Sequence, residues 1–150
     1  SVLYSFPGKE IVPLEIGQSE LSAFKTFLKP GDRLNIQAVF SEKVNTFEDD
    51  GYGNSIKTQV EVFKTETVFG DIIMADLLNG SGESILDVYA SYNEMSVWEQ
   101  AKLDSSDEFK NKTDPRTLLV AFTPEEKERY YYYMSKSNIS FKVSMPQRLQ

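Results

Sequence analysis

The stretch Leu28–Phe40, LKPGDRLNIQAVF, decides how we interpret the fold. It begins with Pro30-Gly31-Asp32, which has the composition of a tight turn: Pro fixes φ, Gly permits a reversal, and Asp accepts amide hydrogen bonds. After the turn, apolar side chains recur at every second position from Leu34 to Phe40, the period of a β-strand. Such a corner can belong to a catalytic site, a ligand cradle or the architecture alone. We expect it to be architectural.

The remaining patterns predict a β-rich α+β fold in a single domain, residues 1–150. Pro and Gly divide residues 1–17 into short extended pieces. We expect a short helix in 18–28, capped by Ser19 and carrying Leu21, Phe24, Phe27 and Leu28 at helical spacing. A strand at 33–41, a long hairpin loop at 42–57 and a return strand at 57–69 follow, and Gly70-Asp71 interrupts the return strand. The remaining expected elements are apolar strands at 72–78 and 116–122, a helix from 124 to about 135, and a last strand at 139–145.

Residues 83–113 have few β signals, and we expect a small helical insert of two or three short helices there. Ser84 is a candidate helix cap after a turn at Gly82. Apolar residues then follow at helical spacing, first Ile85, Val88 and Tyr89, and later Val97, Ala101 and Leu103. Trp98 lies in this insert. A tryptophan in such a position is more often part of a core, but we keep it as a candidate interface residue.

The C-terminal helix, between two strands, has a strong start signal in Thr123-Pro124-Glu125-Glu126, a capping box with Pro at the first helical position. Four consecutive tyrosines, 130–133, follow. On a helix they sweep about 300°, so they cannot share one face. We expect two to pack on the sheet and two to point outward, with Tyr131 and Tyr132 as candidate interface residues.

Composition argues against catalysis and against nucleic-acid binding. The 150 residues include no His and no Cys, which removes the commonest general base, thiolate nucleophiles and the commonest zinc ligands. The formal net charge is −7, and the basic residues are scattered among acids, unlike a phosphate-binding surface. The acidic run Glu48-Asp49-Asp50 lacks the spacing of a calcium loop and is better explained as a solvated loop. We therefore expect no enzyme activity, no cofactor and no metal.

Three segments in this order resemble the CpaB/RcpC family of Flp-type (Tad) pilus assembly proteins. FLKPGDRLNIQAVF is similar to the family's PGD turn and strand, with Asn35 where Asp is usual. TQVEVFKTETVFGDIIMADLLNGSGESI looks like the block that follows, an extended segment, an apolar strand and a turn. RTLLVAFTPEEKERYYYYMSKSNISFKVSMPQR looks like the closing strand, helix and strand. Together they cover about two thirds of the chain, and the 83–113 insert suggests a variant of Gram-positive type.

The resemblance implies SAF-like (β-clip) strands and a non-enzymatic scaffold outside the cytoplasmic membrane. It also implies an N-terminal membrane anchor that this sequence, which begins at Ser1, does not include. Expected partners are other pilus assembly proteins, the pilin or the cell wall, and an open strand edge would also permit self-association. Two other functions remain open. A wall-polysaccharide-binding module would need exposed aromatic residues on a concave surface, and a hydrolase would need a cleft with two carboxylates.

Overall fold

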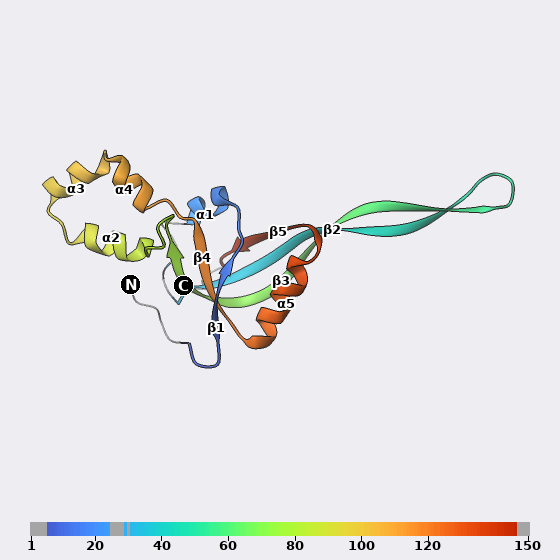
Figure 1. The fold of residues 1–150 in the computed structure, drawn as a ribbon, viewed down its shortest axis with the longest axis horizontal. Coiled ribbons are helices and arrows are strands. Elements are labelled where there is room, and N and C mark those ends of the chain that lie inside the picture. The colour runs from blue at the N-terminus through green and yellow to red at the C-terminus, as the bar shows by residue number, and fades with distance from the viewer. Residues whose placement is uncertain (1–5, 25–28, 30, 147–150) are drawn as a thin grey trace.

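A computed structural model describes residues 6–24, 29 and 31–146 of the chain. Its strands form one antiparallel five-stranded sheet in the order β1-β4-β3-β2-β5, and short helices lie around it (Figure 1). The β-rich α+β architecture expected from the sequence is therefore confirmed. The elements are β1 (Glu10–Leu14), α1 (Gln18–Phe24), β2 (Arg33–Asp49), β3 (Ser55–Leu78), α2 (Ile85–Asn93), α3 (Val97–Asp104), α4 (Asp107–Lys112), β4 (Thr117–Phe122), α5 (Pro124–Met134) and β5 (Ser137–Ser144).

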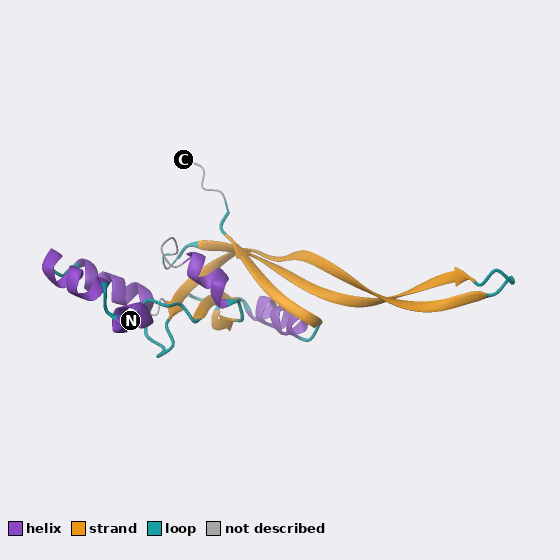
Figure 2. Cartoon of the chain, turned by 90° about the horizontal axis from the view of Figure 1, so that it is seen from above, coloured by secondary structure: helices purple, strands orange, loops and turns teal. Residues whose placement is uncertain are grey.

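The hairpin of β2 and β3 is much longer than the sequence patterns predict. Its strands pair from Arg33 opposite Ile73 to Asp49 opposite Ser55, so the predicted loop at 42–57 is wrong and only residues 50–54 connect the strands. Beyond Ser41 the hairpin leaves the sheet and extends as a twisted two-stranded ribbon (Figure 2). Both faces of such a ribbon meet solvent, so its strands need no alternation of apolar and polar residues.

The predicted break at Gly70-Asp71 is a β-bulge within a continuous β3. The β2–β3 register shifts between Leu34 and Gln37, and Asp71 has a left-handed backbone with φ of 54°. The Asp71 amide donates a hydrogen bond to Asn35 Oδ1 at 3.2 Å. A bulge bends and twists a strand without ending its pairing, so the turn-like composition does not interrupt β3 here.

Helix α5 covers one face of the sheet through Tyr130 and Tyr133. Tyr130 is buried between the rings of Phe122 and Phe141, and its hydroxyl accepts a hydrogen bond from the Glu15 amide at 3.1 Å. Tyr133 lies one turn later, with its ring against Phe40. Tyr131 and Tyr132 point to solvent, which confirms the expected division of the four tyrosines. The capping box of Thr123 and Glu126 is present as predicted.

Helix α1 begins at Gln18, so Ser19 lies inside the helix and its predicted role as the cap is wrong. The carbonyl of Gly17 accepts the amides of Glu20 and Leu21 instead. Leu21 is buried, whereas the side chains of Phe24, Phe27 and Leu28 fall outside what the structure describes.

Three short helices occupy the segment 85–112, and each begins at a serine cap: Ser84, Ser96 and Ser106. Two buried polar residues at the end of β3 tie these helices to the sheet. Ser84 Oγ donates to Asp76 Oδ1 at 2.7 Å, and Asn79 Nδ2 donates to the Lys112 carbonyl at 3.0 Å. Ile85 is buried as expected, but Val97 and Ala101 are exposed because α3 packs no residue into a core.

We predict that Ser84→Ala lowers the free energy of unfolding by about 1–3 kcal/mol, because it removes a helix cap and a hydrogen bond to a buried carboxylate. Ser96→Ala is the matched control, since it removes an equivalent cap from an exposed helix; its cost should stay near 1 kcal/mol or below. Urea denaturation of both variants measures the difference. Equal losses would contradict the role assigned to the Asp76–Ser84 pair.

Candidate protein-binding interface

The corner at residues 29–32 is bound to the protein's own backbone. Gly31 has φ of 90°, and its amide donates to the Met74 carbonyl at 2.9 Å. The Met74 amide donates in turn to the Asp32 carbonyl at 2.8 Å, and Asp32 Oδ2 accepts the Lys29 amide at 2.9 Å. Pro30 lies outside the described residues. These bonds attach the start of β2 to β3, which is an architectural use of the turn.

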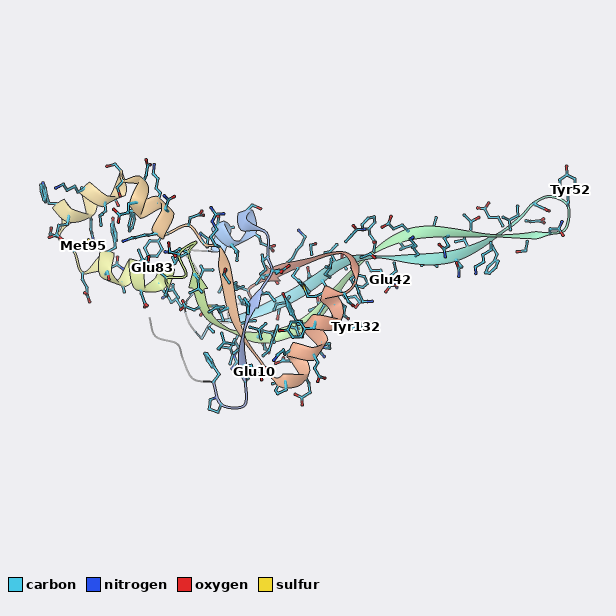
Figure 3. The ribbon with its side chains drawn as sticks, viewed as in Figure 1. Glu10, Glu42, Tyr52, Glu83, Met95 and Tyr132 are labelled. Carbon is cyan, nitrogen blue, oxygen red and sulfur yellow. The ribbon has the colours of Figure 1, made fainter. Side chains whose placement is uncertain are left out.

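The part of the hairpin beyond the sheet is the largest exposed feature of the molecule, and we call residues 42–62 the arm. The last pair between β2 and β5 is Ser41–Ser137, so the arm starts at Glu42 and ends in the loop around Tyr52, which is 90% exposed (Figure 3). The eight residues from Glu42 to Asp49 span about 25 Å.

The acidic residues at the tip of the arm form the turn. Asp50 Oδ1 accepts the amides of Tyr52 at 2.7 Å and Asn54 at 3.1 Å, and Asp49 Oδ1 accepts the Gly51 amide at 3.0 Å. The hydrogen bond from Tyr52 is the main cause that lowers the pKa of Asp50. Among the residues that the structure describes, no group of three or more potential ligands could hold a metal ion.

The two faces of the arm differ in chemistry. Directly opposed residues lie on one face, so Val44 and Val60 share a face with the pairs Glu42–Val62, Thr46–Thr58 and Glu48–Ile56. We call this the apolar face for its aliphatic centre, and Glu42 and Glu48 lie at its two ends. Its four aliphatic side chains are 39–50% exposed. The other, mixed face carries the pairs Lys43–Glu61, Asn45–Gln59 and Phe47–Lys57.

The apolar face of the arm continues the core-facing side of the sheet. Ala38 and Phe40 are buried, and Val44 lies on the same side two pleats beyond Phe40. The cover provided by α5 ends here: Tyr133 packs on Phe40, and Lys136 Nζ lies 4.8 Å from the centre of the Phe40 ring. The inner side of the sheet therefore extends beyond the helix that covers it.

A charge cluster marks the base of the arm, where the body ends. Glu42 forms ion pairs with Lys64 at 2.7 Å and with Lys136 at 3.3 Å. The hydrogen bond from Lys64, followed by that from Lys136, lowers the pKa of Glu42. Asn138 Nδ2 donates to Glu61 and to Ser41 Oγ, both at 2.9 Å. These contacts fix the base of the arm to β5 and to the turn between α5 and β5.

Both edges of the arm are open within the described chain. Pairing of β5 with β2 ends at Ser41, and pairing of β4 with β3 begins only at Ile73. Open strand edges present backbone N–H and C=O groups that can pair with another strand. The arm thus combines open edges with an exposed apolar face, which are the properties of a protein-binding element.

The interface residues expected from the sequence lie on two separate parts of the molecule. Tyr131 and Tyr132 are 56% and 60% exposed on α5, and Trp98 is 71% exposed on α3. The insert and α5 lie at opposite ends of the body in both ribbon views (Figures 1 and 2). The core position considered for Trp98 is therefore wrong; Lys102 Nζ lies 4.8 Å from the centre of its ring.

A cavity of about 570 Å³ lies among the helices of the insert. The rings of Tyr92 and Phe109 stack at 5.0 Å within it, and the Tyr92 hydroxyl donates to Asp104 at 2.6 Å. The carboxylates of Glu83, Asp87 and Glu108 border the cavity, and Glu108 pairs with Lys112 at 3.4 Å. Trp98, Tyr131 and Tyr132 do not line it.

Comparisons of the chain with protein-family models, with curated proteins and with solved structures find no match. No helix of the described residues is long and apolar enough to cross a membrane.

The sequence patterns predict most of the β3 half of the arm, as the return strand at 57–69, but they give the β2 half as a loop, although a signal for it exists. Residues rich in β propensity, including Val44, Phe47, Ile56, Val60 and Val62, flank the turn sequence DDGYGN on both sides. A hairpin pattern of this kind indicates two strands even where neither strand alternates clearly.

We predict that Gly31→Val lowers the free energy of unfolding by about 1–2 kcal/mol, because a β-branched residue is strained at a left-handed φ. Gly31→Asn is the control and should cost less, since Asn tolerates this region better. Thermal or urea unfolding measures both. A Gly31→Val variant with unchanged stability but lost partner binding would show that the corner is a binding site.

Proposed function

We propose that this chain is a non-enzymatic scaffold component of Flp-type (Tad) pilus assembly, which binds other proteins of that machinery outside the cytoplasmic membrane. The observation that carries a protein-binding role is the arm. It exposes Val44, Val60, Val62 and Ile56 on one face and leaves both strand edges open. The pilus context is supported by the three segments that resemble the CpaB/RcpC family, two of which include the hairpin strands.

The contacts at the base of the arm suit it to hold a partner at a fixed distance from the body. The Tyr133 hydroxyl donates a hydrogen bond to Glu66 at 2.8 Å. Lys136 donates a hydrogen bond to Glu42, and Asn138 donates one to Glu61. A two-stranded hairpin is marginally stable alone, so these contacts and the continuous strands stabilise the arm from the body outward. A pre-ordered arm loses less entropy on binding than a flexible loop would.

Shortening the arm tests this function. Deleting residues 44–47 and 57–60 removes four complete cross-strand pairs and brings Lys43–Glu61 next to Glu48–Ile56. Because four residues, an even number, are deleted from each strand, the remaining side chains keep their faces while the arm becomes about 13 Å shorter. The body should keep its melting temperature.

In a strain that makes Flp-type pili through its own copy of this gene, we expect the shortened variant to lose surface pilin while total pilin stays normal. Immunoblots of sheared filaments and of whole cells measure both, with the gene deletion and the full-length gene as references. Trp98→Ala tests the candidate interface residue of the insert separately, and normal pili in this variant would leave the arm as the binding element. Normal pili in the gene deletion would refute the pilus function, and binding to purified wall glycan would then be tested.

A further inference from the structure

The hydrogen-bonding groups on the open edge of β3 follow from the register of the hairpin. The Asp50 amide donates to the Asn54 carbonyl at 3.0 Å, and the register is unbroken from this pair to Gln37–Thr67. Hydrogen-bonded and non-hydrogen-bonded pairs alternate along an antiparallel ribbon. Even-numbered residues of the arm's β3 strand therefore direct their backbone groups to β2. The odd-numbered residues from Ser55 to Phe63 direct theirs to the open edge.

We propose that two copies of this chain pair through this edge, with their β3 strands antiparallel and Gln59 opposite Gln59 of the second copy. The two hairpins then form one four-stranded sheet with a two-fold axis between the glutamines. This inference names the partner of the arm and rests on the proposed protein-binding role of the arm, although not on its pilus context.

The side chains of β3 are complementary to themselves in this register. Lys57 opposes Glu61 of the second copy, and the same pair occurs again across the axis, which gives two opposite-charge pairs. On the apolar face, Ile56 opposes Val62 and Thr58 opposes Val60 of the second copy. The two apolar faces therefore join on the same side of the sheet.

Neighbouring symmetric registers lose this complementarity. A shift that centres the pair on Val60 places Lys57 opposite Phe63, and one centred on Thr58 places it opposite Gln59. A pair centred on Glu61 opposes two carboxylates, and a pair centred on Lys57 opposes two ammonium groups; both are unfavourable. Charge thus selects the register centred on Gln59.

The opposite edge of the arm is less suited to pair with itself. On β2, the register that opposes Lys43 and Asp49 places Val44 opposite Glu48, so an apolar residue faces a charged one. The register centred on Asn45 opposes Glu42 and Glu48. The β3 edge therefore provides the better self-complementary surface.

A single introduced cysteine tests the pairing, because the chain has no cysteine of its own. In a hydrogen-bonded antiparallel pair the two Cα atoms lie about 5.5 Å apart, within the range of a disulfide. Gln59→Cys should therefore form a disulfide-linked dimer in the purified protein under mild oxidation. Asn45→Cys is the matched control, since Asn45 is exposed on the same face directly opposite Gln59. In the proposed dimer the two Asn45 positions are three strand spacings, about 14 Å, apart.

We expect the Gln59→Cys dimer to form at least about tenfold faster than the Asn45→Cys dimer, because pairing raises the effective concentration of one thiol near the other. Non-reducing gels over time measure the rates. Equal rates, or faster linkage at position 45, would overturn the proposal.

Sedimentation velocity provides a second test without cysteines. Lys57→Glu places two carboxylates opposite each other twice in the dimer, and we expect it to weaken self-association at least fivefold. Lys102→Glu changes the net charge equally on α3, far from the arm, and should leave self-association unchanged. Unaltered association in Lys57→Glu would refute the register. Loss of pili on shortening the arm, together with no linkage at position 59, would keep the proposed function and assign the arm another partner.

Discussion

The structure depends on the register between β2 and β3, which is unbroken from the pair Gln37–Thr67 in the body of the sheet to the pair Asp49–Ser55 near the tip of the arm. Side chains alternate between faces with period two, so a slip by one residue would exchange every face. Such a slip would turn Phe40 and Ala38 out of the core and break the pairs Val44–Val60 and Lys43–Glu61. The bulges that shift this register lie between Leu34 and Gln37, within the body of the sheet. The core therefore determines which side chains the arm presents, although no core residue contacts the arm's tip.

The same register explains how an exposed ribbon can be ordered. A free hairpin has too little buried surface to be stable, but here each strand of the arm is the continuation of a strand held in the sheet. At the base, Lys136 contacts Glu42 and Asn138 contacts Glu61, so the segment after α5 fixes both strands where they leave the sheet. Asn138 has a left-handed backbone with φ of 55°, and it lies in β5 where the β2–β5 register shifts between Val39 and Ser41.

Sequence patterns predicted the elements whose stability comes from burial or capping. Strand β4 is a nearly continuous apolar run in which four of six residues are buried, and α5 begins at a capping box whose two hydrogen bonds both form. The division of the four tyrosines follows from helix geometry alone. The β2 half of the arm could not be inferred in this way, because within the described residues neither β5 nor β4 pairs with the arm, and only the β propensity around the turn indicates it. The exposure of Trp98 has a related reason: tryptophan usually indicates a core position, but the short helix α3 buries none of its residues.

Open edges and exposed aliphatic side chains normally expose a protein to unspecific aggregation, and proteins often limit this risk with charged residues. The arm has such charges on its mixed face, where Lys43, Lys57 and Glu61 alternate with amides and Phe47. On the β3 edge these charges oppose like charges in the registers centred on Lys57 and on Glu61, and they attract each other in the register centred on Gln59. Because they lie on the face opposite the aliphatic residues, they can restrict the register without reducing the apolar area available to a partner. In the proposed dimer the two faces would therefore have separate roles: the aliphatic residues of the apolar face would provide affinity, and the charges of the mixed face would decide which strand can pair and in what alignment.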